Sequence, residues 1–160
     1  MARLKDLPLA HRLFMQAYRY RTVDWSPGAQ LARPISASKL ALITSAGLHL
    51  PTQPPFDKSI RGGDFSCREL PSDIDIQSLL IAHRSSAFER AGALEDRNLV
   101  FPLERLRELV DRGEVGSLNH RHFSFMGSIS APSRLIAEKA PAVAADLRLD
   151  NVEAVLLVPV

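Results

Sequence analysis

The stretch KLALITSAG, residues 39–47, decides the fold class of this chain. It begins with a short apolar run that has a β-branched centre at Ile43 and Thr44, and Gly47 follows where the run ends. A run of this length and composition predicts a buried strand that leads into a loop. A second apolar run, VEAVLLVPV at residues 152–160, is rich in valine and predicts another buried strand.

Helical and strand-like segments alternate between and around these two runs. The helical ones are an amphipathic stretch, a short helix, a helix with Pro102 in its first turn and Gly113 after its end, and a stretch that Pro141 kinks or divides. They cover residues 7–20, 85–91, 98–110 and 132–148. Further strands are expected at residues 65–70, 77–83 and 120–126. The alternation predicts an α/β fold with a mainly parallel sheet flanked by helices, Rossmann-like in type.

The chain is expected to form a single domain over residues 1–160. Residues 1–38 would be an N-terminal amphipathic helix and linker, and residues 39–160 the α/β core. Residues 49–64 hold prolines and glycines without periodicity, which is typical of a functional or disordered loop. Because no covering helix follows the last strand, we expect the fold to be incomplete at its C-terminus.

Composition narrows the classes of function. The chain is 46% hydrophobic and 24% charged with a net charge of +2, as in ordinary globular proteins. The basic residues are not clustered, so no nucleic-acid partner is expected. No window of about 18 apolar residues occurs, so no membrane partner is expected either. The first residues lack the apolar centre of a signal peptide, and the single cysteine, Cys67, suits a cytoplasmic location.

No single motif assigns a chemistry. Neither GxGxxG nor GxxxxGK[ST] occurs, so no bound cofactor is expected. The residue types that suit a divalent metal are His49, Asp64, His83, His120 and His122. They leave a metal-dependent hydrolase open as one alternative, and the last two histidines would share one face of a strand. Their spacing matches no zinc signature, so we predict no metal site.

Three polar or reactive side chains, Asp64, Cys67 and Arg68, lie within five residues of one another. Asp64 and Arg68 are four residues apart across an expected strand and would face the same side. They form either a structural salt bridge or a site for a zwitterion whose carboxylate Arg68 holds. Cys67 has no CxxC partner and no obvious base nearby, so we expect an inert thiol.

Six short blocks stand out by their order and spacing. They are ALITSAGLH at residues 41–49, GDFSCRELP at 63–71, His83 after the next strand, DRNLVFPL at 96–103, FMG at 125–127 and DNVEAVLL at 150–157. Together they resemble ALVT-x-AG-V-H, GD-x-S-x-R-x-IP, S/A-H, D-x-N-x-VFPL, FMG and DGVDAVLL of the selenoprotein B family of glycine, sarcosine, betaine and D-proline reductases. In layout the chain is most similar to the small selenium subunit of the D-proline reductases.

The sequence departs from this family at three places. Cys67 stands where the family has an aromatic or variable residue, so it inherits no role. Asn151 replaces a glycine, which is tolerated because asparagine also adopts left-handed backbone geometry. In the family, the strand that resembles residues 155–160 leads directly into a redox motif, a selenocysteine or cysteine followed by a nearby cysteine. We therefore expect selenocysteine just after Val160, at a UGA codon read as a stop.

The resemblance implies a subunit of a selenium- or thiol-dependent reductase that cleaves a C–N bond of an amino acid or an N-methylated amino acid. The substrate amine would be held on a carbonyl (pyruvoyl-type) partner subunit, and a thiol–disulfide reductant would complete the cycle. His49, Asp64, Arg68 and His83 are the candidate catalytic residues, since they fall near predicted loops or strand ends. A non-catalytic binding or assembly subunit of the same fold is the second alternative.

Overall fold

The computed structural model describes residue 5, residues 8–18 and residues 28–160, in two compact units, residues 1–30 and 31–160. The first unit contains α1 (Leu9–Ala17). This helix confirms the amphipathic pattern predicted over residues 7–20, of which residues 7, 19 and 20 lie outside the described residues. Within its unit the apolar side chains of Leu9, Leu13 and Phe14 are exposed. That the whole chain acts as one domain stays a prediction.

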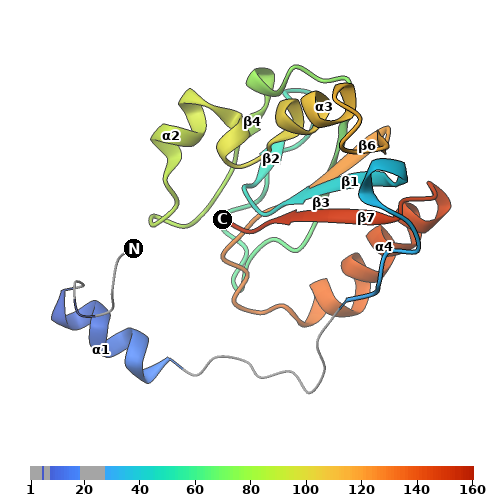
Figure 1. Ribbon diagram of the computed structural model, residues 1–160. Coiled ribbons are helices and arrows are strands. Elements are labelled where there is room, and N and C mark those ends of the chain that lie inside the picture. The colour runs from blue at the N-terminus through green and yellow to red at the C-terminus, as the bar shows by residue number, and fades with distance from the viewer. Residues whose placement is uncertain (1–4, 6–7, 19–27) are drawn as a thin grey trace. The chain divides into compact units, whose positions relative to one another are not determined.

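The second unit contains the α/β core (Figure 1). Its strands are β1 (Lys39–Thr44), β2 (Leu48–His49), β3 (Cys67–Pro71), β4 (Leu80–Ile81), β5 (Ser117–Leu118), β6 (Arg121–Phe125) and β7 (Ala154–Val158). Its α-helices are α2 (Arg90–Glu95), α3 (Leu103–Asp111) and α4 (Ala140–Leu149). Three short 3-10 turns, η2 (Ile35–Ala37), η3 (Ile76–Ser78) and η4 (Arg97–Leu99), and a π-helical turn, η5 (Leu135–Lys139), complete it. No helix in the described ranges is long and apolar enough to span a membrane.

The main sheet is built around β1. This strand pairs in parallel with β5 and β6 and with β7, in register from Leu40 opposite Ala154 to Thr44 opposite Val158. β3 is the exception, because it pairs antiparallel with β6. The prediction of a mixed α/β fold with a mainly parallel sheet is therefore confirmed. A Rossmann-like arrangement is not confirmed.

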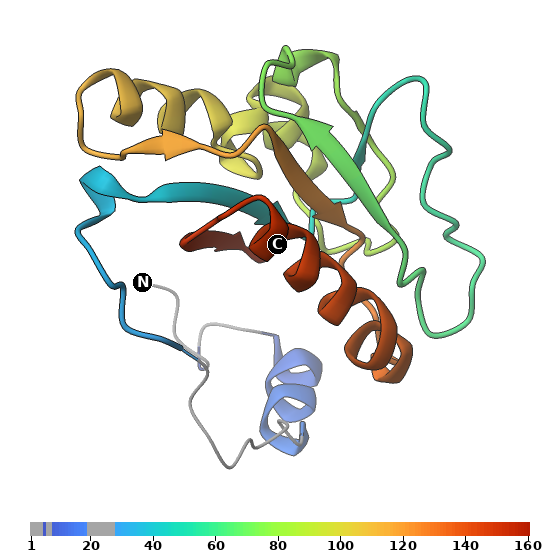
Figure 2. The same cartoon turned by 90° about the vertical axis from the view of Figure 1, so that its right-hand side faces the viewer.

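Helical layers cover the two faces of this sheet (Figures 1 and 2). Alternate β1 residues enter different clusters: Leu40 and Leu42 pack with the buried residues around α3, and Ala41 packs with Phe123 and Val143 beneath α4. Burial of one such leucine is worth about 1.5–3 kcal/mol. The central apolar run therefore stabilises both layers at once.

Three segments differ from the sequence prediction. The helix expected at residues 98–110 begins only at Leu103, with Pro102 as its N-cap residue and η4 before it. Residues 77–83 do not join the main sheet; they contain part of η3 and the two-residue β4, which pairs antiparallel with β2. The reason is a local cap, because the Asp75 side chain accepts a hydrogen bond from the Gln77 N–H and favours a turn. The helix expected at residues 85–91 begins later, at Arg90, where the Glu89 side chain caps its first N–H groups.

The last strand has the predicted position but a different environment. A tight turn at Asn151, whose φ of 58° lies in the left-handed region, leads into β7. β7 pairs with β1 alone among the strands described, so it is an edge strand. Val155, Leu156 and Leu157 are exposed, and the expectation of a buried strand is wrong for these three side chains.

Candidate active site at the carboxyl edge of the sheet

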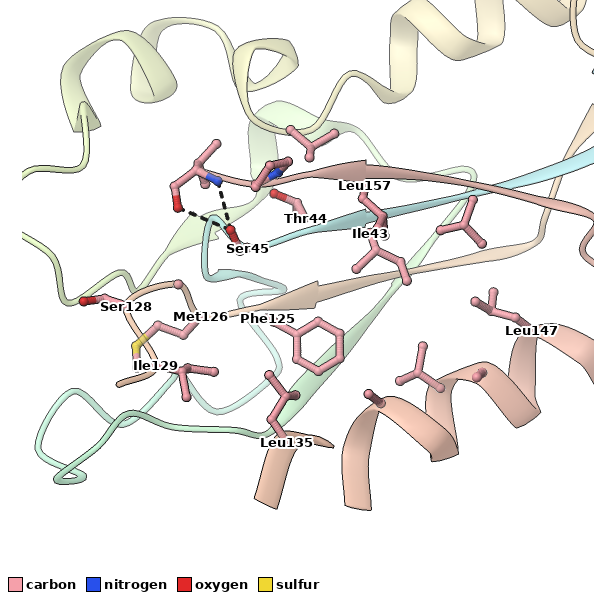
Figure 3. Close-up of a pocket in the computed structure, with 18 residues that line it drawn as sticks. Ile43, Thr44, Ser45, Phe125, Met126, Ser128, Ile129, Leu135, Leu147 and Leu157 are labelled. Atoms are coloured by element: carbon pink, nitrogen blue, oxygen red, sulfur yellow. Dashed lines mark hydrogen bonds between the residues drawn. The ribbon is translucent and has the colours of Figure 1, made fainter. Parts of the chain in front are cut away.

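The carboxyl ends of β1, β6 and β7 meet at one edge of the sheet, where ligand sites of parallel sheets are found. Ser45 ties two of these ends together: its Oγ accepts a hydrogen bond from the Val160 N–H at 2.9 Å and lies 3.3 Å from the Val160 carbonyl oxygen (Figure 3). The Ser45 N–H also donates to the Val158 carbonyl at 3.1 Å. The end of β7 is thus held against the turn that follows β1.

Gly127, the second residue after β6, lies at the centre of this edge. A methyl group added to its α-carbon would lie 2.5 Å from His83 Nε2 and 3.0 Å from the carbonyl oxygens of both Ser45 and Val160. These distances are shorter than normal van der Waals contacts, so only glycine permits the approach. Three polar atoms from three segments therefore converge on one point.

His83 is the candidate catalytic residue that the structure brings to this point. Its Nδ1 accepts a hydrogen bond from the Ser85 N–H at 3.1 Å, and its ring stacks on Phe88 with centroids 4.5 Å apart. The neutral ring therefore carries its proton on Nε2, which is buried and has no hydrogen-bond partner among the residues that the structure describes. Burial, together with the positive charges of Arg90 and Lys58, lowers the pKa of His83, so the neutral form is favoured.

An apolar cavity of about 650 Å³ lies below this edge, between the sheet and α4. Figure 3 shows side chains from the sheet and from the helical segments turned toward it. The apolar lining includes Ile43, Phe125, Leu135, Val143 and Leu157. Ser45 and Ser128 are among the few polar side chains on its wall. The cavity can therefore exclude water from a group at the strand ends and offers little to bind a charged ligand by itself.

Asp64 and Arg68 organise a loop instead of facing a cavity together. Asp64 lies before β3 and accepts hydrogen bonds from the N–H groups of Asp57 and Ser66, which contribute to lowering its pKa although burial opposes them. Arg68 donates to the carbonyl oxygens of Pro54 and Pro55 and lies over the Phe56 ring. Ser66 Oγ joins the two, donating to the Asp64 carboxylate and accepting from Arg68.

His49 lies in a different place from His83. It lines a second cavity, of about 990 Å³, together with Asp57 and Lys58. Its Nδ1 lies 2.9 Å from the Leu50 carbonyl oxygen, to which it donates a hydrogen bond. No hydrogen bond or ion pair joins the His83 side chain to His49, Asp64 or Arg68 in the described ranges. Catalytic roles for these three residues stay predictions.

The structure gathers no group of three or more His, Cys, Asp or Glu side chains that could hold a metal, within the described residues. His120 is exposed before β6, whereas His122 is fully buried within it. Both His122 ring nitrogens are engaged: Nδ1 accepts from the Leu42 N–H at 3.1 Å and Nε2 lies 3.3 Å from Ser72 Oγ. Burial lowers the pKa of His122 to about 4.

Cys67 is half-buried on β3, and burial raises the pKa of its thiol. A raised pKa reduces the thiolate fraction at neutral pH, as expected of an inert cysteine. The sequence reasoning assigned no role to Ser45 or Gly127. The signal that finds them is a small residue one or two positions after a buried strand, at the edge where parallel strands end.

Comparisons with known proteins agree on one family. The profile of the family described as glycine/sarcosine/betaine reductase selenoprotein B matches residues 4–160. The chain is 28% identical over 133 residues to the D-proline reductase subunit gamma of Acetoanaerobium sticklandii, covering 83% of this chain and 52% of that protein. It is 25% identical over 157 residues to the glycine reductase complex component B subunit gamma of Carboxydothermus hydrogenoformans, covering 98% of this chain and 35% of that protein. No solved structure matches.

Proposed function

Because the chain belongs to the glycine/sarcosine/betaine reductase selenoprotein B family, we propose that it is a subunit of a reductase complex that cleaves a C–N bond in an amino acid or an N-methylated amino acid. The observation that carries this proposal is the family match over residues 4–160, which includes every element of the α/β core. The two relatives are, by their names, subunits of a D-proline reductase and of a glycine reductase complex. A carbonyl (pyruvoyl-type) subunit and a thiol–disulfide reductant are the partners this reaction requires.

The nucleophile belongs, on this proposal, to a segment after Val160. The chain spans about half the length of one relative and about a third of the other, so the relatives have room for it. A selenolate or thiolate supplies a strong nucleophile at neutral pH and a selenide–sulfide or disulfide bond for its release. One feature of the carboxyl edge fits such a group: the buried His83 Nε2, which has no hydrogen-bond partner among the described residues.

The chain's own residues would prepare this edge in two ways. Ser45 holds the end of β7 against the turn after β1, which sets the direction in which a following segment leaves. The apolar side chains beside that position, such as Phe125, lower the polarity around it and so favour a poorly solvated, reactive anion.

The first test is the nucleotide sequence after Val160. We expect a UGA codon, an in-frame cysteine codon within about four positions, and then an amphipathic helix of about 12–15 residues, an ordinary length. A UAA or UAG codon, or a downstream sequence without this pattern, would contradict the position we assign to the nucleophile.

The second test is turnover by the reconstituted complex. The chain read through position 160, with its carbonyl subunit and dithiothreitol, is expected to cleave the C–N bond of one of glycine, sarcosine, betaine or D-proline. The product to measure is ammonia or a methylated amine for the first three, and the ring-opened amino acid for D-proline. The 160-residue chain alone is expected to cleave none of these bonds, because one cysteine cannot cycle between dithiol and disulfide within a monomer. Turnover by the isolated chain would point back to Cys67.

A non-catalytic assembly subunit is the second candidate. The observation in its favour is that burial raises the pKa of Cys67, the one thiol of the chain, which lowers the fraction of reactive thiolate at neutral pH. An assembly subunit predicts that the chain binds the carbonyl subunit while the complex turns over without any residue beyond Val160. Loss of turnover when the downstream cysteine or selenocysteine codon is changed to serine would exclude it.

A further inference from the structure

Four arginine side chains of the α/β core bind backbone carbonyl groups, and the ion pairs of the described residues are made by other arginines. The four are Arg68, Arg90, Arg97 and Arg107. Three of them are partly exposed, so water solvates their charge. Arg97 is the exception, because only 6% of this residue is exposed. A buried charge without a counter-ion destabilises a protein unless a ligand or another group compensates it.

Hydrogen bonds satisfy only part of the Arg97 guanidinium group. Nε donates to the Leu79 carbonyl oxygen at 3.2 Å, and Nη1 donates to the Ala93 carbonyl oxygen at 2.6 Å. Nη2 makes no hydrogen bond to a described residue, yet it is not one of the fully buried atoms without a partner, so it is open to solvent. The backbone is fixed as well, because the Arg97 carbonyl oxygen accepts hydrogen bonds from the Val100 and Phe101 N–H groups. Arg97 therefore presents the two N–H donors of Nη2 at a fixed position.

Arg97 lies in the wall of the second cavity, of about 990 Å³, which is large enough for a small organic ligand. This cavity shares no lining residue with the one beneath the carboxyl edge. Apolar side chains, among them Leu80, Ile81 and Leu94, form much of its wall, and the two leucines are about half exposed at 47% and 51%. A cation at a fixed position is thus combined with an accessible apolar surface.

The other charged side chains of this wall compensate each other. Asp57 and Lys58 are both exposed and have opposite charges. Hydrogen bonds from the hydroxyl and N–H groups of Ser59 lower the pKa of Asp57, so its carboxylate is ionised at neutral pH. With His49 counted as neutral, the wall has one surplus positive charge, that of Arg97. The cavity therefore matches a ligand with a single negative charge.

We propose that this cavity binds a small organic monocarboxylate, whose carboxylate accepts hydrogen bonds from Arg97 Nη2 and whose apolar body packs against Ile81 and Leu94. The planar guanidinium group suits a carboxylate in geometry as well as in charge. A zwitterionic amino acid fits less well, because its ammonium group would lie close to the guanidinium group and would lose solvent there. The inference concerns a second site and does not depend on the proposed reductase function.

A fluorinated probe tests the site without turnover. Binding of 4-fluorobenzoate to the chain is followed by ¹⁹F NMR line widths, with 4-fluorobenzamide as the uncharged probe of the same shape. Arg97→Met is expected to weaken binding of the benzoate about tenfold, and the amide is expected to bind the parent chain about tenfold more weakly than the benzoate. Arg97→Lys, which keeps the charge but not the fork of donors, is expected to fall between the two.

Arg107→Met is the matched control. Arg107 also donates to two carbonyl groups, those of Ser72 and Ile74, but it lines neither cavity, so this variant is expected to bind the benzoate as the parent chain does. The position of the probe is measured by nuclear Overhauser effects. Its ring protons are expected to contact the methyl groups of Ile81 and Leu94 and not those of the cavity beneath the carboxyl edge.

Equal affinity of the parent chain and a folded Arg97→Met variant would overturn the proposal. If that variant does not fold, the parent chain decides: equal binding of benzoate and amide, or contacts only in the other cavity, also overturns it. Displacement of the probe by an equal concentration of betaine, D-proline or inorganic phosphate would assign the cavity to another class of ligand and overturn the choice of a monocarboxylate. Turnover of the reductase complex is measured separately, so no result of these titrations changes the reductase assignment.

Discussion

β1 and β7 are adjacent strands of similar apolar sequence, yet their environments are opposite. They pair in register over five positions, but Leu42 in β1 is fully buried while Leu157 in β7 is 65% exposed. β1 has strand neighbours on both sides and packed clusters on both faces, whereas β7 has β1 alone beside it and an open cavity beneath it. Apolar composition therefore identifies a strand, and the number of neighbours decides its burial.

The His122 side chain also holds β1, at the position where its neighbouring strand changes from β5 to β6. β5 pairs with its first two residues and β6 with its last two, and the Leu42 N–H between them donates to His122 Nδ1. The segment after β7 is held differently, by hydrogen bonds between the Ser45 hydroxyl group and the backbone of Val160. The predictions below test this contrast, from the largest expected effect to the smallest.

The same substitution in the two strands should have very different effects. Leu42→Ala removes a fully buried side chain and leaves a cavity, so we expect the free energy of unfolding to fall by about 2–5 kcal/mol. Leu157→Ala is expected to change it by less than about 1 kcal/mol, because that side chain is mostly in water. Urea unfolding followed by circular dichroism measures both. Equal losses would show that β7 is buried in solution.

Acid should lower the free energy of unfolding, because it protonates His122, whose ring accepts a hydrogen bond from β1. The pKa of His122 is about 4 in the folded chain, below the ordinary value of 6.5, so between these pH values the unfolded chain binds the proton and the folded chain does not. The free energy of unfolding should therefore fall as the pH falls from about 6.5 to about 4, by up to about 3 kcal/mol. His122→Gln should flatten this dependence, and His120→Gln should not. The same slope in all three proteins would contradict the assignment.

Adding a methyl group where β1, β6 and β7 end should push these segments apart. Gly127→Ala places its new carbon 2.5 Å from the His83 ring, so we expect a loss of about 1–3 kcal/mol in the free energy of unfolding. Gly92→Ala, in α2, is the matched control and should be neutral or slightly stabilising, because the side chain it meets, Leu99, can move. Thermal melts of both variants make the comparison, and a neutral Gly127→Ala would show that the edge is looser than described.

The exposed face of β7 should bind a hydrophobic dye. The 160-residue chain is expected to raise ANS fluorescence, and Leu157→Lys to reduce that signal with little change in melting temperature. Leu149→Lys removes an equally exposed leucine from the end of α4 and serves as the control. The chain extended through the downstream codons should bind less dye and melt higher, because burial of apolar area is worth about 25 cal/mol per Å². Identical dye binding in every protein would contradict an open face on β7.

Much of the local structure could be predicted from sequence because each signal is local. The apolar run at residues 39–45 predicts β1, and Pro102 with Gly113 brackets α3 within a residue or two. The run at residues 77–83 failed because a cap at Asp75 outweighed its apolar composition. Of the candidate site residues, His83 reaches the carboxyl edge, while Asp64 and Arg68 are engaged in their own loop.

The sequence by itself determined the strands β1, β6 and β7, the left-handed turn at Asn151 and the family, since these depend on neighbouring residues or on the spacing of short blocks. The tertiary structure alone decided that β7 lies at an edge and that His83 Nε2, Ser45 and Gly127 meet at its end. The physical reason is that these contacts join segments more than 30 residues apart in the chain, where no periodicity or propensity reports which surfaces meet.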